Sequence, residues 1–250
     1  MTLILELAGI GKRFGAFTAL EDVGFAIGEG EAVGLIGPNG AGKTTLFNVI
    51  TGFLRPDAGS IRFAGNALDG LRPAQRVARG LARTFQTAMV FPGLTARENI
   101  AMAARQHAGA GLRWLGGTRA NAAAAETAAR LLDDAGLLHR AETPLHDLSH
   151  GERRIVDALM PLALSPRLLL LDEPTAGLTR ADSDRLFGIL RRSHGATALL
   201  LVAHDLDIVF DHCDRVAVME LGRVIRIGTP AGIRGDAEVR RAYLGAAASP

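Results

Sequence analysis

A short glycine-rich stretch holding one lysine, residues 37–44, is the part of the chain whose residue types most directly specify a chemistry. It reads GPNGAGKT and satisfies the pattern G-x-x-x-x-G-K-[S/T] at every fixed position. Glycines let the backbone curl until successive N–H groups point at phosphate oxygens, and a following helix adds the positive end of its dipole. We expect Lys43 to reach the β- and γ-phosphates of a nucleotide and the Thr44 hydroxyl to ligate Mg²⁺. The predicted nucleotide contacts here are Gly37, Asn39, Gly40, Gly42, Lys43, Thr44 and Thr45.

An ordinary glycine turn before a helix is the alternative for this stretch, and the lysine content argues against it. Only two of the 28 basic residues are lysines, Lys12 and Lys43. In so arginine-rich a chain, a lysine is improbable by chance at the one position where the pattern requires it. We therefore favour nucleotide binding.

A second group of residues joins an apolar run to two acids. Residues 168–171 are four consecutive leucines, and Asp172 and Glu173 follow directly. A buried strand would deliver Asp172 to the carboxyl edge of a parallel sheet, where ligands bind in open α/β folds. Asp172 can hold Mg²⁺ through water, and Glu173 can position or deprotonate an attacking water. A simple strand cap is the alternative, and the presence of the phosphate-loop motif in the same chain weighs against it.

The segments that must position these residues alternate between strand and helix. Short apolar runs at 31–36, 168–171 and 198–203 read as buried strands, and each precedes a loop or a helical pattern. Such alternation predicts an α/β fold with a mainly parallel sheet, covered by helices on both faces. Leucines recur at every second position in 3–7, at Leu3, Leu5 and Leu7, which we interpret as an edge strand.

Between residues 87 and 164 the sequence changes character. Alanine dominates, and strong helix formers occupy 97–106 and 120–135 with a glycine-rich loop between them. We therefore expect an inserted α-helical subdomain at 87–164. Residues 1–86 and 165–250 would then form the nucleotide-binding core.

Composition narrows the choice of partners. The 250 residues carry 28 basic and 26 acidic side chains, a net charge of +2, so no nucleic acid is expected as a partner. Arg72, Arg76, Arg79 and Arg83 recur at near-helical spacing and are expected to form a solvated helix face. No apolar run approaches the ~20 residues of a spanning helix, so a membrane link would run through another protein. Cys213 is the only cysteine, which excludes an internal disulfide.

Further motifs make the chain resemble the ABC transporter ATPases over nearly its whole length. Residues 148–152 read LSHGE, which is similar to the family's LSGGQ signature, and they begin 24 residues before Asp172. Gln86 falls at the place of the family's Q-loop glutamine, His204 at its switch histidine and Phe14 at its adenine-stacking aromatic residue. The resemblance implies a RecA-like P-loop NTPase core with a parallel sheet, an antiparallel β region and an inserted α-helical subdomain.

The resemblance also implies ATP and Mg²⁺ as ligands and ATP hydrolysis as the activity. Gln86 would contact Mg²⁺ and water, His204 the γ-phosphate, and Phe14 the adenine ring. Ser149 and Gly151 would bind the γ-phosphate of an ATP held by a second ATPase subunit, in a head-to-tail homo- or heterodimer. Transmembrane permease subunits would be direct partners and a periplasmic or extracellular solute-binding protein an indirect one. The chain would then lie at the cytoplasmic face of the membrane.

Several positions depart from the family pattern. His150 and Glu152 replace glycine and glutamine of the commonest signature, and Ser149 with Glu152 forms an S-x-x-E capping box for the next helix. Thr179 stands where the family's D-loop often carries a carboxylate, which leaves open how two nucleotide sites communicate. Pro161 lies in a helical pattern and should kink or end that helix.

Three segments resemble the ATPases of branched-chain and hydrophobic amino-acid importers: residues 84–100, an insert at 112–117 and the ending 238–245. Close relatives serve urea, amides or aromatic acids, and cargo is chosen by other subunits, so those cargoes remain alternatives. A soluble ABC ATPase of translation or DNA repair is disfavoured, because the chain has neither a second such domain nor long coiled coils. A regulatory subunit without turnover is disfavoured because the catalytic set is complete.

Overall fold

The computed structural model describes residues 2–84, 90–107, 118–192, 197–203 and 205–247. Its central sheet has six strands: β3 (Ala32–Ile36), β6 (Leu81–Arg83), β7 (Leu168–Asp172), β8 (Ala198–Val202), β9 (Arg215–Glu220) and β10 (Arg223–Gly228). They lie in the order β10-β9-β3-β8-β7-β6. Neighbours pair in parallel except β9 and β10, which form a hairpin. The expected mainly parallel sheet is therefore confirmed.

A second, antiparallel sheet packs beside it. Its strands are β1 (Leu3–Phe14), β2 (Phe17–Gly28), β4 (Ala58–Phe63) and β5 (Asn66–Ala67), in the order β2-β1-β4-β5. The interpretation of residues 3–7 as an edge strand was wrong, because β1 pairs with β2 on one side and β4 on the other. A register shift between Leu3 and Leu5 lets both Ile4 and Leu5 be buried, so the strand is less strictly alternating than the sequence suggested.

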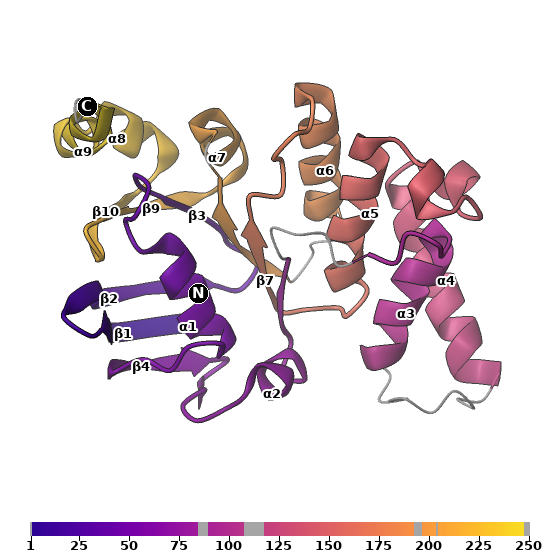
Figure 1. Cartoon of the computed structure of the whole chain (residues 1–250), viewed down its shortest axis with the longest axis horizontal. Coiled ribbons are helices and arrows are strands. Elements are labelled where there is room, and N and C mark those ends of the chain that lie inside the picture. The colour runs from indigo at the N-terminus through magenta and orange to yellow at the C-terminus, as the bar shows by residue number, and fades with distance from the viewer. Residues whose placement is uncertain (1, 85–89, 108–117, 193–196, 204, 248–250) are drawn as a thin grey trace.

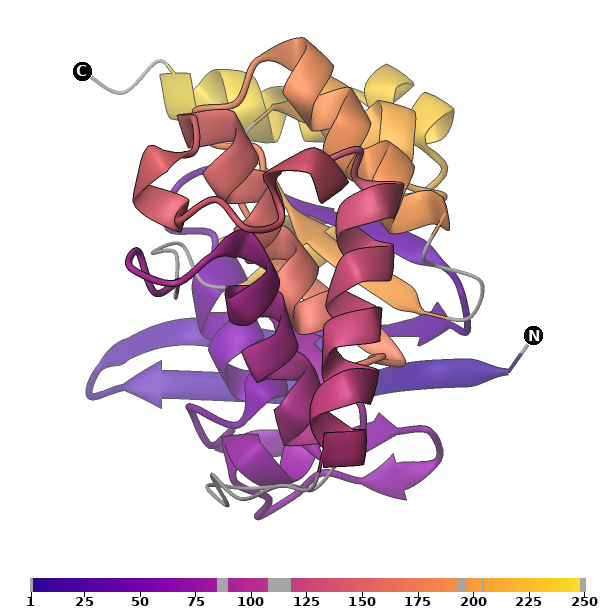
Figure 2. The same ribbon diagram turned by 90° about the vertical axis from the view of Figure 1, so that its right-hand side faces the viewer.

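Helices occupy both faces of the central sheet and one end of the molecule (Figure 1). They are α1 (Lys43–Thr51), α2 (Pro73–Val77), α3 (Ala96–His107), α4 (Thr118–Asp134), α5 (His150–Leu162), α6 (Arg180–Arg192), α7 (Leu206–His212), α8 (Pro230–Gly235) and α9 (Ala237–Ala247), with 3-10 turns η1 (Leu138–Arg140) and η2 (Leu145–Asp147). Figure 2 shows α3 and α4 side by side, and Figure 1 places them at the end opposite the antiparallel sheet. The helix patterns expected at 97–106 and 120–135 correspond to these two helices, and α5 ends one residue after Pro161.

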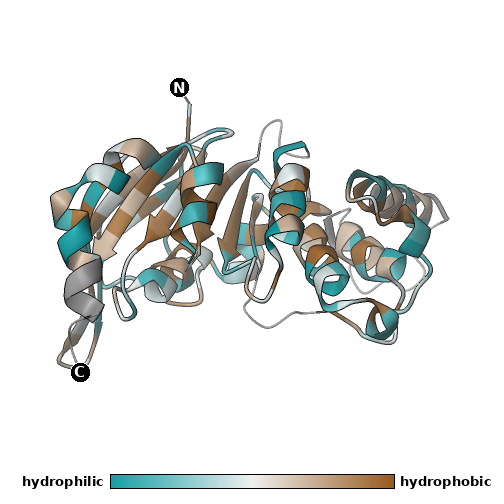
Figure 3. Cartoon of the chain, turned by 90° about the horizontal axis from the view of Figure 1, so that it is seen from above, coloured by the Kyte–Doolittle hydropathy of each residue, from teal (hydrophilic) through white to brown (hydrophobic). Residues whose placement is uncertain are grey.

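Alternate residues of the sheet strands supply two hydrophobic clusters, one on each face. In β7, Leu168 and Leu170 belong to the cluster that contains α1 and the antiparallel sheet. Leu169 and Leu171 belong to the cluster that contains residues of α3 to α7. Figure 3 shows the apolar residues running along the strands and along the helix faces that meet them. Burial on both faces explains why β7 reads as an uninterrupted apolar run.

The expected solvated arginine face does not exist as such, because Arg76 is buried. Its guanidinium donates to the carbonyl oxygens of Val49 and Ile50 at 2.8 and 2.6 Å, and to that of Leu68 at 3.0 Å. The last carbonyls of a helix have no partner within the helix, so Arg76 caps the end of α1. Burial lowers the pKa of Arg76 below its usual value. The near-helical spacing of the arginines predicted a solvent-exposed face, but spacing alone contains no information on the tertiary contacts of each side chain.

Candidate nucleotide site

The glycine-rich stretch forms a tight loop between β3 and α1. Gly37 and Gly42 have φ values of +155° and +101°. A Cβ at Gly37 would lie 2.2 Å from the Met219 carbonyl oxygen, and one at Gly42 would lie 2.7 Å from that of Ala19. The loop therefore needs glycine at both positions, to turn and to pass close to β2 and β9. No side chain caps the N-terminus of α1, which leaves that end suited to an anion.

Lys43, the first residue of α1, lies inside this loop. Its ammonium donates to the carbonyl oxygens of Gly37 and Pro38 at 2.6 and 3.0 Å. Burial lowers the pKa of Lys43, and the negative charges of Glu173 and Asp172 partly offset this effect. The two acids are therefore close enough to act on the lysine electrostatically. The structure thus brings together the two motifs that the sequence places more than 120 residues apart.

A cavity of about 380 Å³ opens over the loop. It is lined by Phe17, Ala19, Asn39, Gly40, Ala41, Gly42, Lys43, Thr44, Thr45, Glu173 and Val202. Besides Lys43, six residues that were predicted to bind nucleotide or to act in catalysis line this cavity: Asn39, Gly40, Gly42, Thr44, Thr45 and Glu173. A larger hollow of about 480 Å³ lies between residues 52–59 and 69–76, away from both motifs. Because it holds neither the loop nor the acids, we assign the phosphate chemistry to the smaller cavity.

Asp172 ends β7 in a buried ion pair. Arg83 Nη2 lies 2.8 Å from Asp172 Oδ2, with the side chains 8% and 2% exposed, and Arg83 Nη1 donates to Asn48 Oδ1 at 2.6 Å. The Asp172 N–H donates to the Thr84 hydroxyl at 3.2 Å. Arg83 was expected on a solvated face and is instead part of the site. Sequence order alone did not reveal it, although its place three residues before Gln86 was a signal.

Thr44 and Asp172 have the chemistry to hold a magnesium ion that is also coordinated by phosphate oxygens. Mg²⁺ keeps several waters and takes one or two protein ligands together with phosphate oxygens. The Thr44 hydroxyl on the cavity wall and the Asp172 carboxylate near Lys43 supply that number of oxygen donors. Among the residues that the structure describes, no cluster of three or more His, Cys, Asp or Glu side chains could form an all-protein metal cage.

Glu173 follows in a turn with a left-handed backbone, with φ at +50°. Its N–H donates to the Val202 carbonyl oxygen of β8 at 2.8 Å. Its side chain borders the cavity over the loop and a second hollow of about 250 Å³ that Thr175, Arg180 and Asp205 also line. Glu173 therefore lies beside the space over the glycine-rich loop.

The start of α5 confirms the predicted capping box. The Ser149 hydroxyl accepts from the Glu152 N–H at 3.2 Å, and Glu152 Oε2 accepts from the Ser149 N–H at 2.9 Å. The Ser149 N–H, and to a smaller extent its hydroxyl and Arg140, lower the pKa of Glu152. Neither Ser149 nor Gly151 lines the cavity over the loop. The signature segment of this chain therefore does not close its own phosphate site in the structure.

The departures from the family pattern have local structural roles. Thr179 caps α6: its hydroxyl accepts from the Asp182 N–H at 3.2 Å and donates to Asp182 Oδ2 at 2.7 Å. A Cβ at Gly151 would lie 3.0 Å from that same carboxylate oxygen, and one at Gly177 would lie 3.0 Å from His150 Nε2. The signature segment and the segment after Glu173 therefore touch at two points.

Two aromatic residues stand at the turn between β1 and β2. Phe14 and Phe17 are paired across this turn and are 49% and 63% exposed. Lys12 Nζ lies 5.7 Å from the centre of the Phe14 ring. Phe17 lines the cavity and Phe14 does not, so Phe17 is an aromatic candidate that the sequence pattern did not single out. Its signal was a second phenylalanine three positions after the first.

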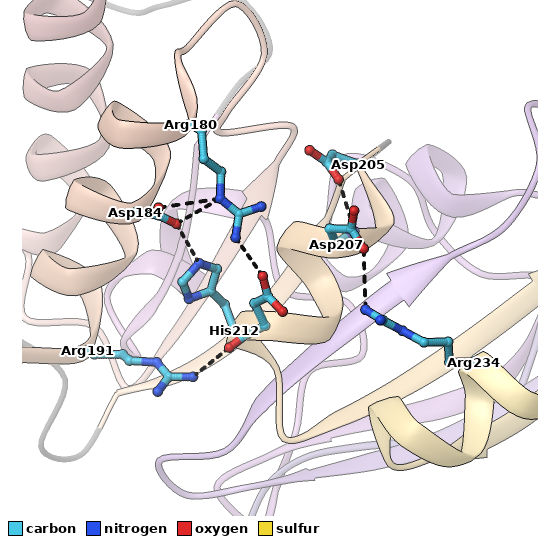
Figure 4. A network of polar contacts seen from close by, with 8 residues as sticks. Arg180, Asp184, Arg191, Asp205, Asp207, His212 and Arg234 are labelled. Atoms are coloured by element: carbon cyan, nitrogen blue, oxygen red, sulfur yellow. Dashed lines mark hydrogen bonds and ion pairs between the residues drawn. The ribbon is translucent and has the colours of Figure 1, made fainter.

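Gln86 and His204 lie outside the described residues. The helix α7, which begins two residues after position 204, contacts its neighbours through a network of polar side chains (Figure 4). Arg180 at the start of α6 contacts Asp184 at 3.2 Å and Asp211 of α7 at 2.6 Å, and His212 lies 3.6 Å from Asp184. Burial lowers the pKa of His212, with Arg191 acting in the same direction. The helices that follow Glu173 and β8 are thus braced against each other.

The fold and this site define a nucleotide-binding protein with a phosphate-binding loop. The sequence matches the model of the ABC transporter family over residues 20–176, and the model of the branched-chain amino acid ATP-binding cassette transporter over residues 223–249. It is 38% identical to LivG of Escherichia coli (strain K12) and to BraF of Pseudomonas aeruginosa, over 98% of each chain in both comparisons. Both relatives are named as high-affinity branched-chain amino acid transport ATP-binding proteins.

Solved structures agree with the sequence comparisons. MJ1267, an ATP-binding cassette of an ABC transporter, has a TM-score of 0.85 and 30% identity, covering 97% of this chain and 99% of its own. A nucleotide-free cassette from an ABC transporter has a TM-score of 0.82 and 28% identity, covering 96% and 98%. The chain belongs to the ABC transporter ATP-binding family and is an ATP hydrolase. Within the described part of the chain, every helix is too short or too polar to span a membrane.

Proposed function

We propose that this chain powers an importer of branched-chain or other hydrophobic amino acids by binding and hydrolysing ATP. The observation that carries the proposal is the split of the site: Lys43 and Glu173 share one cavity, while Ser149 at the start of α5 stands outside it. The full-length similarity to two branched-chain amino-acid transport proteins supports the cargo class. Residues 1–86 and 165–250 would form the core, and 87–164 the helical subdomain.

In the proposed site, the loop from Gly37 to Thr45 cradles the phosphates, with Lys43 as the main cation and Asn39, Gly40 and Gly42 contributing the turn. Thr44 and Asp172 would hold Mg²⁺. When bound, the ion would neutralise charge on the β- and γ-phosphate oxygens. Asp172 offers Oδ1, because Oδ2 is engaged by Arg83.

Glu173 would position the water that attacks the γ-phosphate and accept its proton. Gln86 would contact the metal and this water, and His204 the γ-phosphate. Phe14 would stack on adenine, and Phe17 would contribute the wall that it already forms beside the loop. The roles of Gln86, His204 and Phe14 are assigned through the family pattern, and that of Phe17 through its place in the cavity wall.

Two such chains, or this chain and a paralogue, would close head to tail on two ATP molecules. Ser149 and Gly151 of one subunit would then meet the γ-phosphate held by the other, because a helix start can present to an anion the N–H groups that its cap leaves unengaged. Closure would drive transmembrane permease subunits, which receive solute from a binding protein. The solute bound by the receptor that co-purifies with the complex would distinguish amino acids from urea or amides.

Glu173→Gln tests the assignment of the reaction. The amide keeps the shape of the side chain but lacks a basic carboxylate, so ATP should still bind while turnover falls at least about a hundredfold. A closed, ATP-bound dimer should accumulate, measured by light scattering after gel filtration. Glu126→Gln in α4 is the matched control, because Glu126 is exposed and outside the cavity. Normal hydrolysis by the Glu173 variant would refute the role.

A further inference from the structure

The helix that begins with the signature also holds the backbone around Glu173. Arg154, in the second turn of α5, donates from Nη2 to the Glu173 carbonyl oxygen at 2.9 Å and from Nε to the Pro174 carbonyl oxygen at 3.3 Å. Its Nη1 donates to Asp157 Oδ2 at 3.3 Å. One guanidinium therefore joins acceptors on α5 and on the turn after β7, as its planar fork of donors allows.

The turn that Arg154 holds has an unusual backbone. Glu173 has a φ of +50°, a region that non-glycine residues adopt only where their surroundings hold them. Its N–H is fixed by the carbonyl of Val202 in the sheet. Its carbonyl accepts from Arg154 and, at 3.2 Å, from the Ala176 N–H within the turn. Arg154 is thus the link from this carbonyl to another element of the fold.

Asp157 keeps the guanidinium in place. Arg154 and Asp157 lie three residues apart on α5, and each side chain is 11% exposed. A cation with so little access to water needs a nearby negative charge, which Asp157 provides. The pair is therefore arranged to present donors to the Glu173 turn at low electrostatic cost.

We infer that Arg154 is a positioning residue for hydrolysis, which fixes the Glu173 turn from α5. The direction of the Glu173 carboxylate then depends on where α5 lies. This inference rests on the proposed role of Glu173. Since the first turn of α5 also carries Ser149 and Gly151, one helix touches both nucleotide sites of the proposed dimer. Arg154 supplies a connection between those sites that does not require the D-loop carboxylate replaced by Thr179.

Arg154→Met tests the inference, because methionine fills similar space without donors. A small displacement of a catalytic group costs a large part of the rate, so kcat should fall about tenfold to a hundredfold. The affinity of the separate chain for a fluorescent ATP analogue should stay within about twofold, since Arg154 does not touch the phosphate loop. Arg154→Lys should recover only part of the rate, because one ammonium does not reproduce the fork. Arg130→Met, at an exposed arginine of α4, is the matched control and should hydrolyse as the unchanged chain does.

Combining variants separates positioning from a general loss of structure. If Arg154 acts through Glu173, the double variant Arg154→Met/Glu173→Gln should turn over no more slowly than Glu173→Gln alone. It should also form the ATP-bound closed dimer as well as Glu173→Gln does. Additive losses of rate, a lost dimer or a parallel loss of ATP affinity would overturn the inference.

The outcomes also separate this inference from the proposed function. If Glu173→Gln is inactive while Arg154→Met keeps the full kcat, the inference is wrong and the proposed function stands. If Glu173→Gln hydrolyses ATP normally, the proposed role of Glu173 fails, and the inference fails with it.

Discussion

Arg83 and Asp172 form a buried ion pair, and Arg83 also contacts α1. The guanidinium bridges the carboxylate of β7 and the amide oxygen of Asn48, and it lies 5.4 Å from the centre of the Phe47 ring. The strands β6 and β7 and the helix α1 therefore meet at this one side chain. A charge removed from water is tolerable only while its partner is present, so both members of the pair are vulnerable.

Arg83→Met should therefore lower the free energy of unfolding by about 3–5 kcal/mol, because it leaves Asp172 buried without its guanidinium. Urea denaturation followed by circular dichroism measures the change. Adding Asp172→Asn to the variant should restore part of the stability, since the uncompensated charge is then removed. Arg79→Met, at an exposed position of the same sequence pattern, should stay within about 0.5 kcal/mol of the unchanged chain. Equal losses at both positions would contradict the argument.

Among the elements, α5 combines several tasks along 13 residues. Its first turn is closed by the reciprocal bonds of Ser149 and Glu152, and its second turn holds Arg154 against the turn after β7. Its buried face packs in the cluster shared with α3 and the sheet. The helix start must stay well formed for the segment to present N–H groups to a phosphate, so the cap serves stability and binding together.

Acid should weaken this cap. The pKa of Glu152 is lowered from 4.5, so its carboxylate stabilises the fold above that value and the gain is lost as pH falls through the lowered pKa. At pH 7, Glu152→Gln should cost about 0.3–1 kcal/mol of unfolding free energy, because the amide is a weaker acceptor at a helix start. The difference should shrink in urea titrations taken progressively below pH 4.5. A difference that is constant with pH would show that the charge of Glu152 contributes nothing.

Over the whole molecule, the two halves of the proposed nucleotide site belong to different regions. The phosphate loop lies in the core between β3 and α1, whereas the signature segment starts a helix of the group at the other end (Figure 1). Because Ser149 and Gly151 do not line the cavity of their own chain, a second copy or a paralogue is needed to complete each site in the proposed arrangement. In such a dimer, each nucleotide site would contain residues of both subunits.

Two inactive variants should therefore restore each other. Lys43→Ala removes the main phosphate cation, and Ser149→Arg fills the start of α5 with a bulky cation. Each should be inactive alone in a phosphate-release assay. In a mixture, the intact loop of one variant faces the intact signature of the other, so hydrolysis should rise well above that of either. A mixture that stays inactive, although Ser149→Arg still binds ATP, would count against shared sites. A mixture of Lys43→Ala with Glu173→Gln is the negative control, because both variants are damaged in the loop half of the site and no pairing of the two chains gives a complete site.

The residues with a strict local pattern could be predicted from the sequence. The glycine-rich loop and the S-x-x-E cap each depend on neighbours a few positions away, so their conformations follow from backbone geometry and short-range hydrogen bonds. The acids after four leucines were placed at the sheet edge by the end of a buried strand. The alternation of strands and helices likewise predicted the parallel sheet, because burial on both faces leaves a continuous apolar run. The spacing of these motifs predicted the family.

Tertiary structure alone decided which distant residues share an environment. Arg76 and Arg83 looked like a solvated face, yet one caps α1 and the other pairs with an acid 89 positions away. The first strand, β1, is an inner strand of the antiparallel sheet, because β2 pairs with one of its edges and β4 with the other. Phe17, rather than Phe14, borders the cavity, and Arg154 meets Glu173 across 19 positions. These contacts depend on how whole elements pack, and the residue type of one partner does not identify the other.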